Sequence, residues 1–134
     1  AGRSEMSWRD AAKERLCLLS NDMQNRRIID RAFATVGETP RPVIEANALI
    51  PVMSHVRLGE WSAIVPQSLL LLTGLSNGLR ALPMGDPKPS HAIGLVYADR
   101  EPVSGLVAAF LATAKRQKLQ QRIDAVASLP AATP

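Results

Sequence analysis

The apolar and polar positions of residues 16–66 form short apolar runs separated by longer amphipathic segments. Residues 16–19 are a continuous apolar run, which is typical of a strand buried on both faces of a sheet. The next segment repeats apolar side chains at helical spacing and predicts a helix over 25–36. The same order recurs in three further segments: a strand over 43–46, a helix over 49–58 and a strand over 61–65. Such an order predicts an α/β fold with parallel strands.

Capping residues indicate where these helices end and begin. Gly37 and Gly59 follow the last apolar positions of the two helices, where a left-handed backbone commonly ends a helix. Asn47 is expected to cap the helix over 49–58. Pro51 is tolerated only in a first turn, so this helix is expected to begin late or to bend.

The two ends of the chain carry weaker signals. Ser7 is expected to cap a short helix within a polar lead-in linker over residues 1–15. The expected later elements are a short helix over 67–72, an edge strand over 79–83, a last strand over 91–97 and a long helix beginning near Pro102. Prolines and a glycine over 85–89 mark a boundary, and residues 123–134 are expected to be a disordered tail.

Composition and charge narrow the class of protein. With 134 residues, 46% of them apolar, the chain can form one domain with a substantial core. No apolar run approaches the ~20 residues that cross a bilayer, and no signal peptide is recognisable, so we expect a cytoplasmic protein without a membrane partner. The net charge is +4, but the basic side chains of residues 26–31 alternate with acidic ones. We expect solvated helix faces, with a functional basic surface as the alternative, and no DNA contact by this segment itself.

Residues that could carry catalysis or hold a cofactor are sparse. Cys17 is the single cysteine, which excludes an intrachain disulfide, and its apolar neighbours predict a buried thiol. His55 and His91 have no second ligand at metal-binding spacing. Ser54 and His55 are neighbours on a helix and point in different directions, so they form no catalytic pair. We therefore expect no catalytic residue, no metal and no cofactor, and a binding module instead of an enzyme.

Polar residues that directly follow strands are the candidate ligand-binding residues. In parallel α/β sheets, ligands bind at the carboxyl ends of the strands, where helix N-termini also attract anions. The candidates Ser20, Asn21, Asn47 and Gln67 lie at or beside three such helix starts. Each of their side chains can donate and accept hydrogen bonds. For Asn47, a plain capping role is the alternative.

Several groups of residues occur in a recognisable order between residues 16 and 115. They are Glu45-Ala46-Asn47 before a helix with Val56 and Gly59, then Ala63-Ile64-Val65-Pro66, Leu82-Pro83, His91-Ala92-Ile93-Gly94-Leu95-Val96, and a final helix with Phe110. In this order and spacing the chain resembles the C-terminal part of the effector-binding domain of LysR-type transcriptional regulators. Trp61 stands near a position where that family usually has a second glycine. The lone Cys17 argues against the cysteine pair of oxidant-sensing members.

The resemblance implies a fold like that of periplasmic binding proteins, in which a ligand cleft separates two α/β lobes. Residues 16–85 would form the second, Rossmann-like lobe, and residues 86–122 would return to a first, incomplete lobe. The resemblance also implies a homo-oligomer that binds a small-molecule effector such as a carboxylate or another anion. DNA would be bound only by a helix-turn-helix domain missing from this chain, which we therefore expect to be a fragment of a longer regulator. The alternative is a stand-alone solute-binding module.

Overall fold

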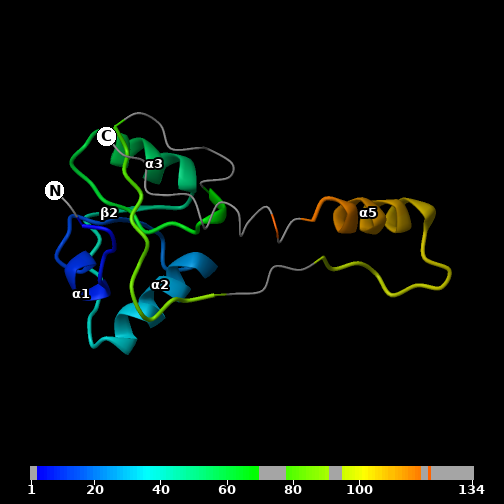
Figure 1. Ribbon diagram of the computed structural model, residues 1–134, viewed down its shortest axis with the longest axis horizontal. Helices are drawn as coiled ribbons and strands as arrows, with labels where there is room; N and C mark the ends of the chain where they lie inside the picture. The colour runs from blue at the N-terminus through cyan, green and yellow to red at the C-terminus, as the bar shows by residue number, and fades with distance from the viewer. Residues whose placement is uncertain (1–2, 70–77, 91–94, 119–120, 122–134) are drawn as a thin grey trace. The chain divides into compact units, whose positions relative to one another are not determined.

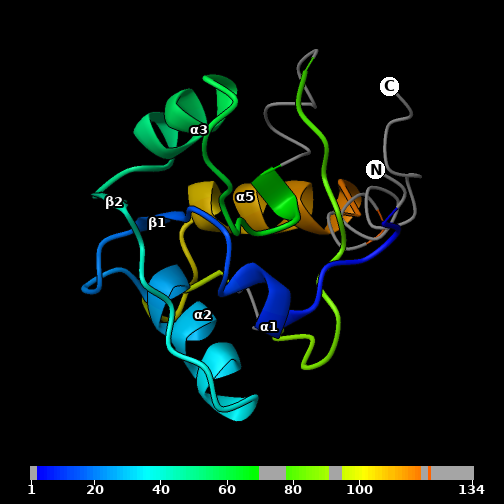
Figure 2. The same cartoon turned by 90° about the vertical axis from the view of Figure 1, so that its left-hand side faces the viewer.

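The described part of the protein divides into two units. The computed structural model describes residues 3–69, 78–90, 95–118 and 121. The first unit lies within residues 3–89 and the second begins at Ser90. Figure 1 labels the helices α1, α2, α3 and α5 and the strand β2, and Figure 2 also labels β1.

Parallel strand pairing, as predicted, organises the first unit. Strand β1 (Cys17–Leu19) pairs with β2 (Ile44–Ala46) in parallel, with Cys17 opposite Ile44 and Leu19 opposite Ala46. On its other edge, β1 is joined to the following chain by one parallel bridge between Leu16 and Ser62. The Cys17 amide donates to the Ser62 carbonyl at 2.9 Å. The predicted strand over 61–65 is therefore reduced to this single bridge, and β1 lies in the middle.

Strand β1 is buried on both faces, as its continuous apolar run predicts. One face carries Leu16 and Leu18, which belong to a cluster with Trp8, Ala11, Ile29, Ala32 and Phe33. The other face carries Cys17 and Leu19, which pack with Val52. Cys17 is a free cysteine, and burial raises the pKa of its thiol. Figure 2 shows the two layers, with α3 on one side of the strands and α1 and α2 on the other.

The two helices that cover the strands agree closely with the sequence pattern. Helix α2 (Gln24–Thr35) is followed by Val36 and then Gly37, whose φ of +76° is the left-handed conformation expected there. Helix α3 (Leu49–Arg57) is followed by Gly59, with φ of +84°. Pro51 lies in the first turn of α3, where its missing N–H would have had no partner within the helix.

The capping role predicted for Asn47 is wrong. The residue at the N-cap of α3 is Ala48, and no side-chain hydrogen bond caps this helix in the described structure. Asn47 lies one residue earlier and is exposed. Its amide is therefore available for another role.

Residues 3–15 belong to the folded unit and do not form the predicted lead-in linker. Helix α1 (Trp8–Ala11) is capped by Ser7, whose hydroxyl accepts a hydrogen bond from the Asp10 amide at 3.1 Å, as predicted. The Trp8 side chain is only 1% exposed and meets the Phe33 ring edge to face, with ring centroids 5.0 Å apart. A parallel bridge joins Met6 to Met84. The predicted edge strand over 79–83 is absent from the described residues, because pairing there is limited to this bridge.

The described part of the second unit contains a long helix beside residues 95–98. Helix α5 (Gly105–Arg116) begins three residues later than Pro102, and the Ser104 hydroxyl caps it by accepting from the Val107 amide at 3.3 Å. Residues 95–97 are extended but unpaired in the described structure, so the last strand is not formed there. The apolar face of α5 is largely exposed: Leu106 is 83% and Phe110 59% accessible.

Some predictions fall outside the described residues. These are residues 70–72 of the helix over 67–72, residues 91–94 of the last strand with His91, and the tail over 123–134. In the described part, no helix is long and apolar enough to cross a membrane.

Candidate functional site

Three of the four candidate residues lie at one end of the sheet, where the carboxyl ends of β1 and β2 meet. Ser20 follows β1 directly, and Asn47 follows β2 directly. The Ser20 amide donates to the Ala46 carbonyl at 2.9 Å, so the two strand ends are joined just before Asn47. Asn21 continues the same loop. Parallel pairing thus brings Ser20, Asn21 and Asn47 together, as the sequence predicts.

Gln67 lies in the loop that leaves the segment on the other side of β1. The bridge between Leu16 and Ser62 is parallel, so the chain after Ser62 runs in the direction of β1. A turn follows, closed by the Leu69 amide donating to the Pro66 carbonyl at 2.9 Å. Gln67 is exposed in this turn. No described contact joins its side chain to Ser20 or Asn47.

The loop between β1 and α2 and the first turn of α2 have polar groups with unmet hydrogen-bonding capacity. The N-cap of α2 is Met23, and no side chain caps the helix within the described structure. The Ser20 hydroxyl and the Asn25 side-chain nitrogen are buried without a well-aligned hydrogen-bond partner among the described residues. Buried polar groups are usually paired with protein or with water. This loop therefore offers donors for an additional group.

Asp22 adds a negative charge to the same loop. The Ser20 hydroxyl approaches this carboxylate and, together with the Asp22 backbone amide and Arg27, holds its pKa below the ordinary value. Asp22 is exposed and ionised at neutral pH.

Arg26 is buried, whereas the sequence predicts a solvated helix face for it, with a functional basic surface as the alternative. The Arg26 Nη1 donates to the Leu19 carbonyl at 2.9 Å and also to the Glu45 carboxylate. Its Nε donates to the Asp30 carboxylate at 2.8 Å. The Arg26 and Asp30 spacing of four residues is visible in the sequence, but it is equally typical of an exposed ion pair on a helix.

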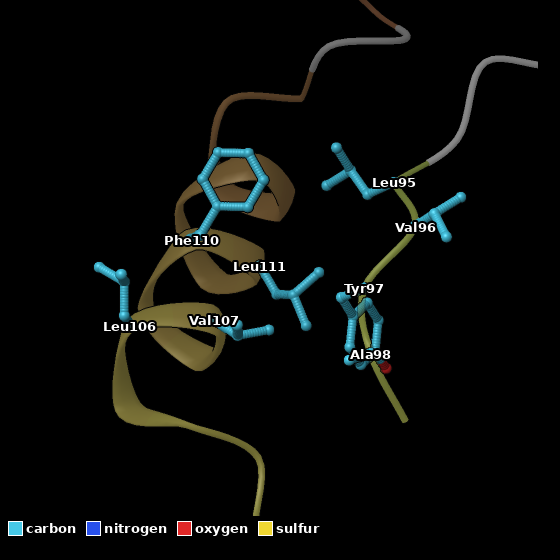
Figure 3. A pocket seen from close by; sticks show the side chains of 8 residues that line it. All are labelled: Leu95, Val96, Tyr97, Ala98, Leu106, Val107, Phe110 and Leu111. Carbon is cyan, nitrogen blue, oxygen red and sulfur yellow. The ribbon is translucent and has the colours of Figure 1, made fainter. Parts of the chain in front are cut away.

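The two cavities found among the described residues lie away from the candidate ligand-binding residues. In the first unit, a cavity of about 90 Å³ is lined by Leu16, Ser62 and Met84 among others, near the amino end of β1. In the second unit, an apolar groove of about 500 Å³ is lined by eight residues from 95–98 and 106–111 (Figure 3). Neither contains a candidate residue. Among the described residues, no group of three or more His, Cys, Asp or Glu side chains could hold a metal ion.

The parallel strands and their covering helices define an α/β domain, and a family comparison identifies which one. The family model described as the LysR substrate binding domain matches residues 1–118, so the chain belongs to this family. The chain is part of the effector-binding domain of a LysR-type regulator. Domains of this family belong to regulators and not to enzymes. The match includes residues 3–15, in agreement with the burial of Trp8. No curated protein matches this chain.

Proposed function

We propose that this domain binds a small anionic effector, such as a carboxylate, at the carboxyl ends of β1 and β2. Ser20, Asn21 and Asn47 would contact the ligand directly, and Gln67 would approach it from the neighbouring loop. The observation that carries the proposal is the hydrogen bond from the Ser20 amide to the Ala46 carbonyl, which joins the two strand ends beside the uncapped start of α2. Free N–H groups at a helix start favour negative charge.

In the proposed regulator, ligand binding changes the population of two arrangements of the effector domain. Residues 16–85, together with residues 3–15 that pack against them, are proposed as one lobe, and residues 86–122 as the return to the other. A helix-turn-helix domain outside this chain would convert the change into altered DNA binding, with the regulator acting as a homo-oligomer in the cytoplasm. For this coupling to work, the ligand must bind the two arrangements with different free energies.

A thermal-unfolding screen tests the proposed site. The chain is heated with acetate, succinate, benzoate, sulfate or phosphate, and at least one anion is expected to raise the midpoint. Asn47→Ala is expected to change the free energy of unfolding by no more than about 0.5 kcal/mol, because Asn47 is exposed and caps no helix. The same variant, and Ser20→Ala, should lose most of the response to the anion.

Ser54→Ala is the matched control for Ser20→Ala. Ser54 is an exposed serine whose hydroxyl donates within α3 to the Ile50 carbonyl at 3.0 Å. Its variant should keep the full response. A full response in Asn47→Ala and Ser20→Ala would remove both residues from the site, and no response to any anion would contradict the proposed ligand class.

A further inference from the structure

We propose that Arg26 is a positioning residue that holds the carboxyl ends of β1 and β2, and with them the loop of Ser20, in one arrangement. One guanidinium bonds to both strands, through the Leu19 carbonyl and the Glu45 carboxylate. Leu19 directly precedes Ser20, and Glu45 lies two residues before Asn47. Arg26 therefore contacts residues that neighbour the proposed ligand-binding residues, and it acts on the ligand only through them. Its relevance to sensing rests on the proposed function, but its effect on the strands does not.

Because Arg26 is buried, its guanidinium is confined to one position between the two strands and α2. The Arg26 side chain is 9% exposed, whereas its partners Glu45 and Asp30 are 47% and 38% exposed. Burial lowers the pKa of the guanidinium, but the hydrogen bonds to Glu45 and Asp30 outweigh it, so the pKa is raised and the charge is kept. A buried charge must be bonded in a defined geometry, and a planar fork can serve several acceptors at once. The contacts thus define one position for the guanidinium.

The hydrogen bonds of Arg26 also connect α2 to the carboxyl ends of β1 and β2. The Nε–Asp30 pair lies within α2, so the guanidinium is anchored on its own helix while it reaches both strands. A shift of Leu19 or Glu45 relative to α2 would have to break at least one of these bonds. The carboxyl ends of the two strands and α2 are expected to move as one body for this reason.

The opposite end of the strands is held without Arg26. There the Val43 amide donates to the Leu16 carbonyl at 2.8 Å. The Ser20 and Val43 amides therefore report on the two ends of the same strand pair. Local loosening at the carboxyl end exposes the first amide alone, whereas a general loss of stability exposes both.

Amide hydrogen exchange on the 134-residue chain tests the proposal without any ligand. In Arg26→Met, the protection of the Ser20 amide is expected to fall at least about tenfold relative to the Val43 amide. Arg26→Lys keeps a charged donor but not the planar fork, and should restore part of the protection. Arg31→Met is the matched control, because Arg31 is an exposed arginine on the same helix, and should leave the ratio unchanged.

An equal fall at Ser20 and Val43, or no change in their ratio, would overturn the positioning role. If Arg26→Met does not fold, Glu45→Gln provides the same comparison, because Glu45 is nearly half exposed. A smaller selective fall at Ser20 then supports the proposal, and an unchanged ratio overturns it. Since no anion is present, a negative result here does not bear on ligand binding, and a negative anion screen does not alter the exchange result.

Discussion

Replacing Trp8 with alanine is expected to lower the free energy of unfolding by about 3–5 kcal/mol. The Trp8 side chain is almost fully buried and contacts the Phe33 ring edge to face, a geometry that adds to the stability from burial alone. Its indole nitrogen also donates to the Gly85 carbonyl at 3.0 Å and to the Pro87 carbonyl at 2.8 Å. The alanine variant loses the packing and leaves these carbonyls without the indole donor.

Urea denaturation of Trp8→Ala beside Trp61→Ala measures this effect. Trp61 is a half-buried tryptophan that stacks under the Arg15 guanidinium at 4.0 Å, so its loss is expected to cost only about 1–2 kcal/mol. A cost for Trp8→Ala below about 1 kcal/mol would show that residues 3–15 do not belong to the core.

The second large effect on the free energy of unfolding is expected in β1, where two leucines on opposite faces should both contribute strongly to stability. Leu18 packs among α1 and α2, and Leu19 packs with Val52 of α3. Both are buried, at 1% and 4% exposure. Leu18→Ala and Leu19→Ala should therefore each cost about 2–5 kcal/mol, because each leaves a cavity in a packed layer.

Ile50→Ala provides the comparison for these two variants. Ile50 is a large aliphatic residue on α3 that is 81% exposed, and its replacement should change stability by no more than about 0.5 kcal/mol. Denaturation midpoints and slopes for the three variants give the comparison. A large cost for only one of the two leucines would contradict a strand covered on both faces.

The sequence predicts the elements whose signals are local. The apolar run of residues 16–19 indicates burial on both faces, and the apolar spacing of residues 25–36 indicates α2 to within a residue at each end. Gly37 and Gly59 mark the ends of helices because left-handed backbone favours glycine. Ser20, Asn21 and Asn47 meet at one edge because parallel pairing alone brings strand ends together.

Features that depend on distant partners could not be predicted in this way. Trp8 lies among polar neighbours, and its burial depends on Phe33 and on the Gly85 and Pro87 carbonyls, far along the chain. Arg26 has the spacing of an exposed ion pair, and only the approach of Leu19 and Glu45 buries it. The segment over 61–65 has strand-like composition, but pairing partners decide strand formation, and one bridge forms.

Chemical-shift mapping tests the central claim most directly. The ¹⁵N-labelled chain is titrated with the anion that raises the unfolding midpoint most, and amide shifts are followed residue by residue. The largest changes are expected at Ser20, Asn21 and Asn47, with a smaller change at Gln67. Changes centred instead on the apolar groove of residues 95–111, or near Leu16 and Ser62 at the amino end of β1, would contradict an effector site at the carboxyl ends of the strands.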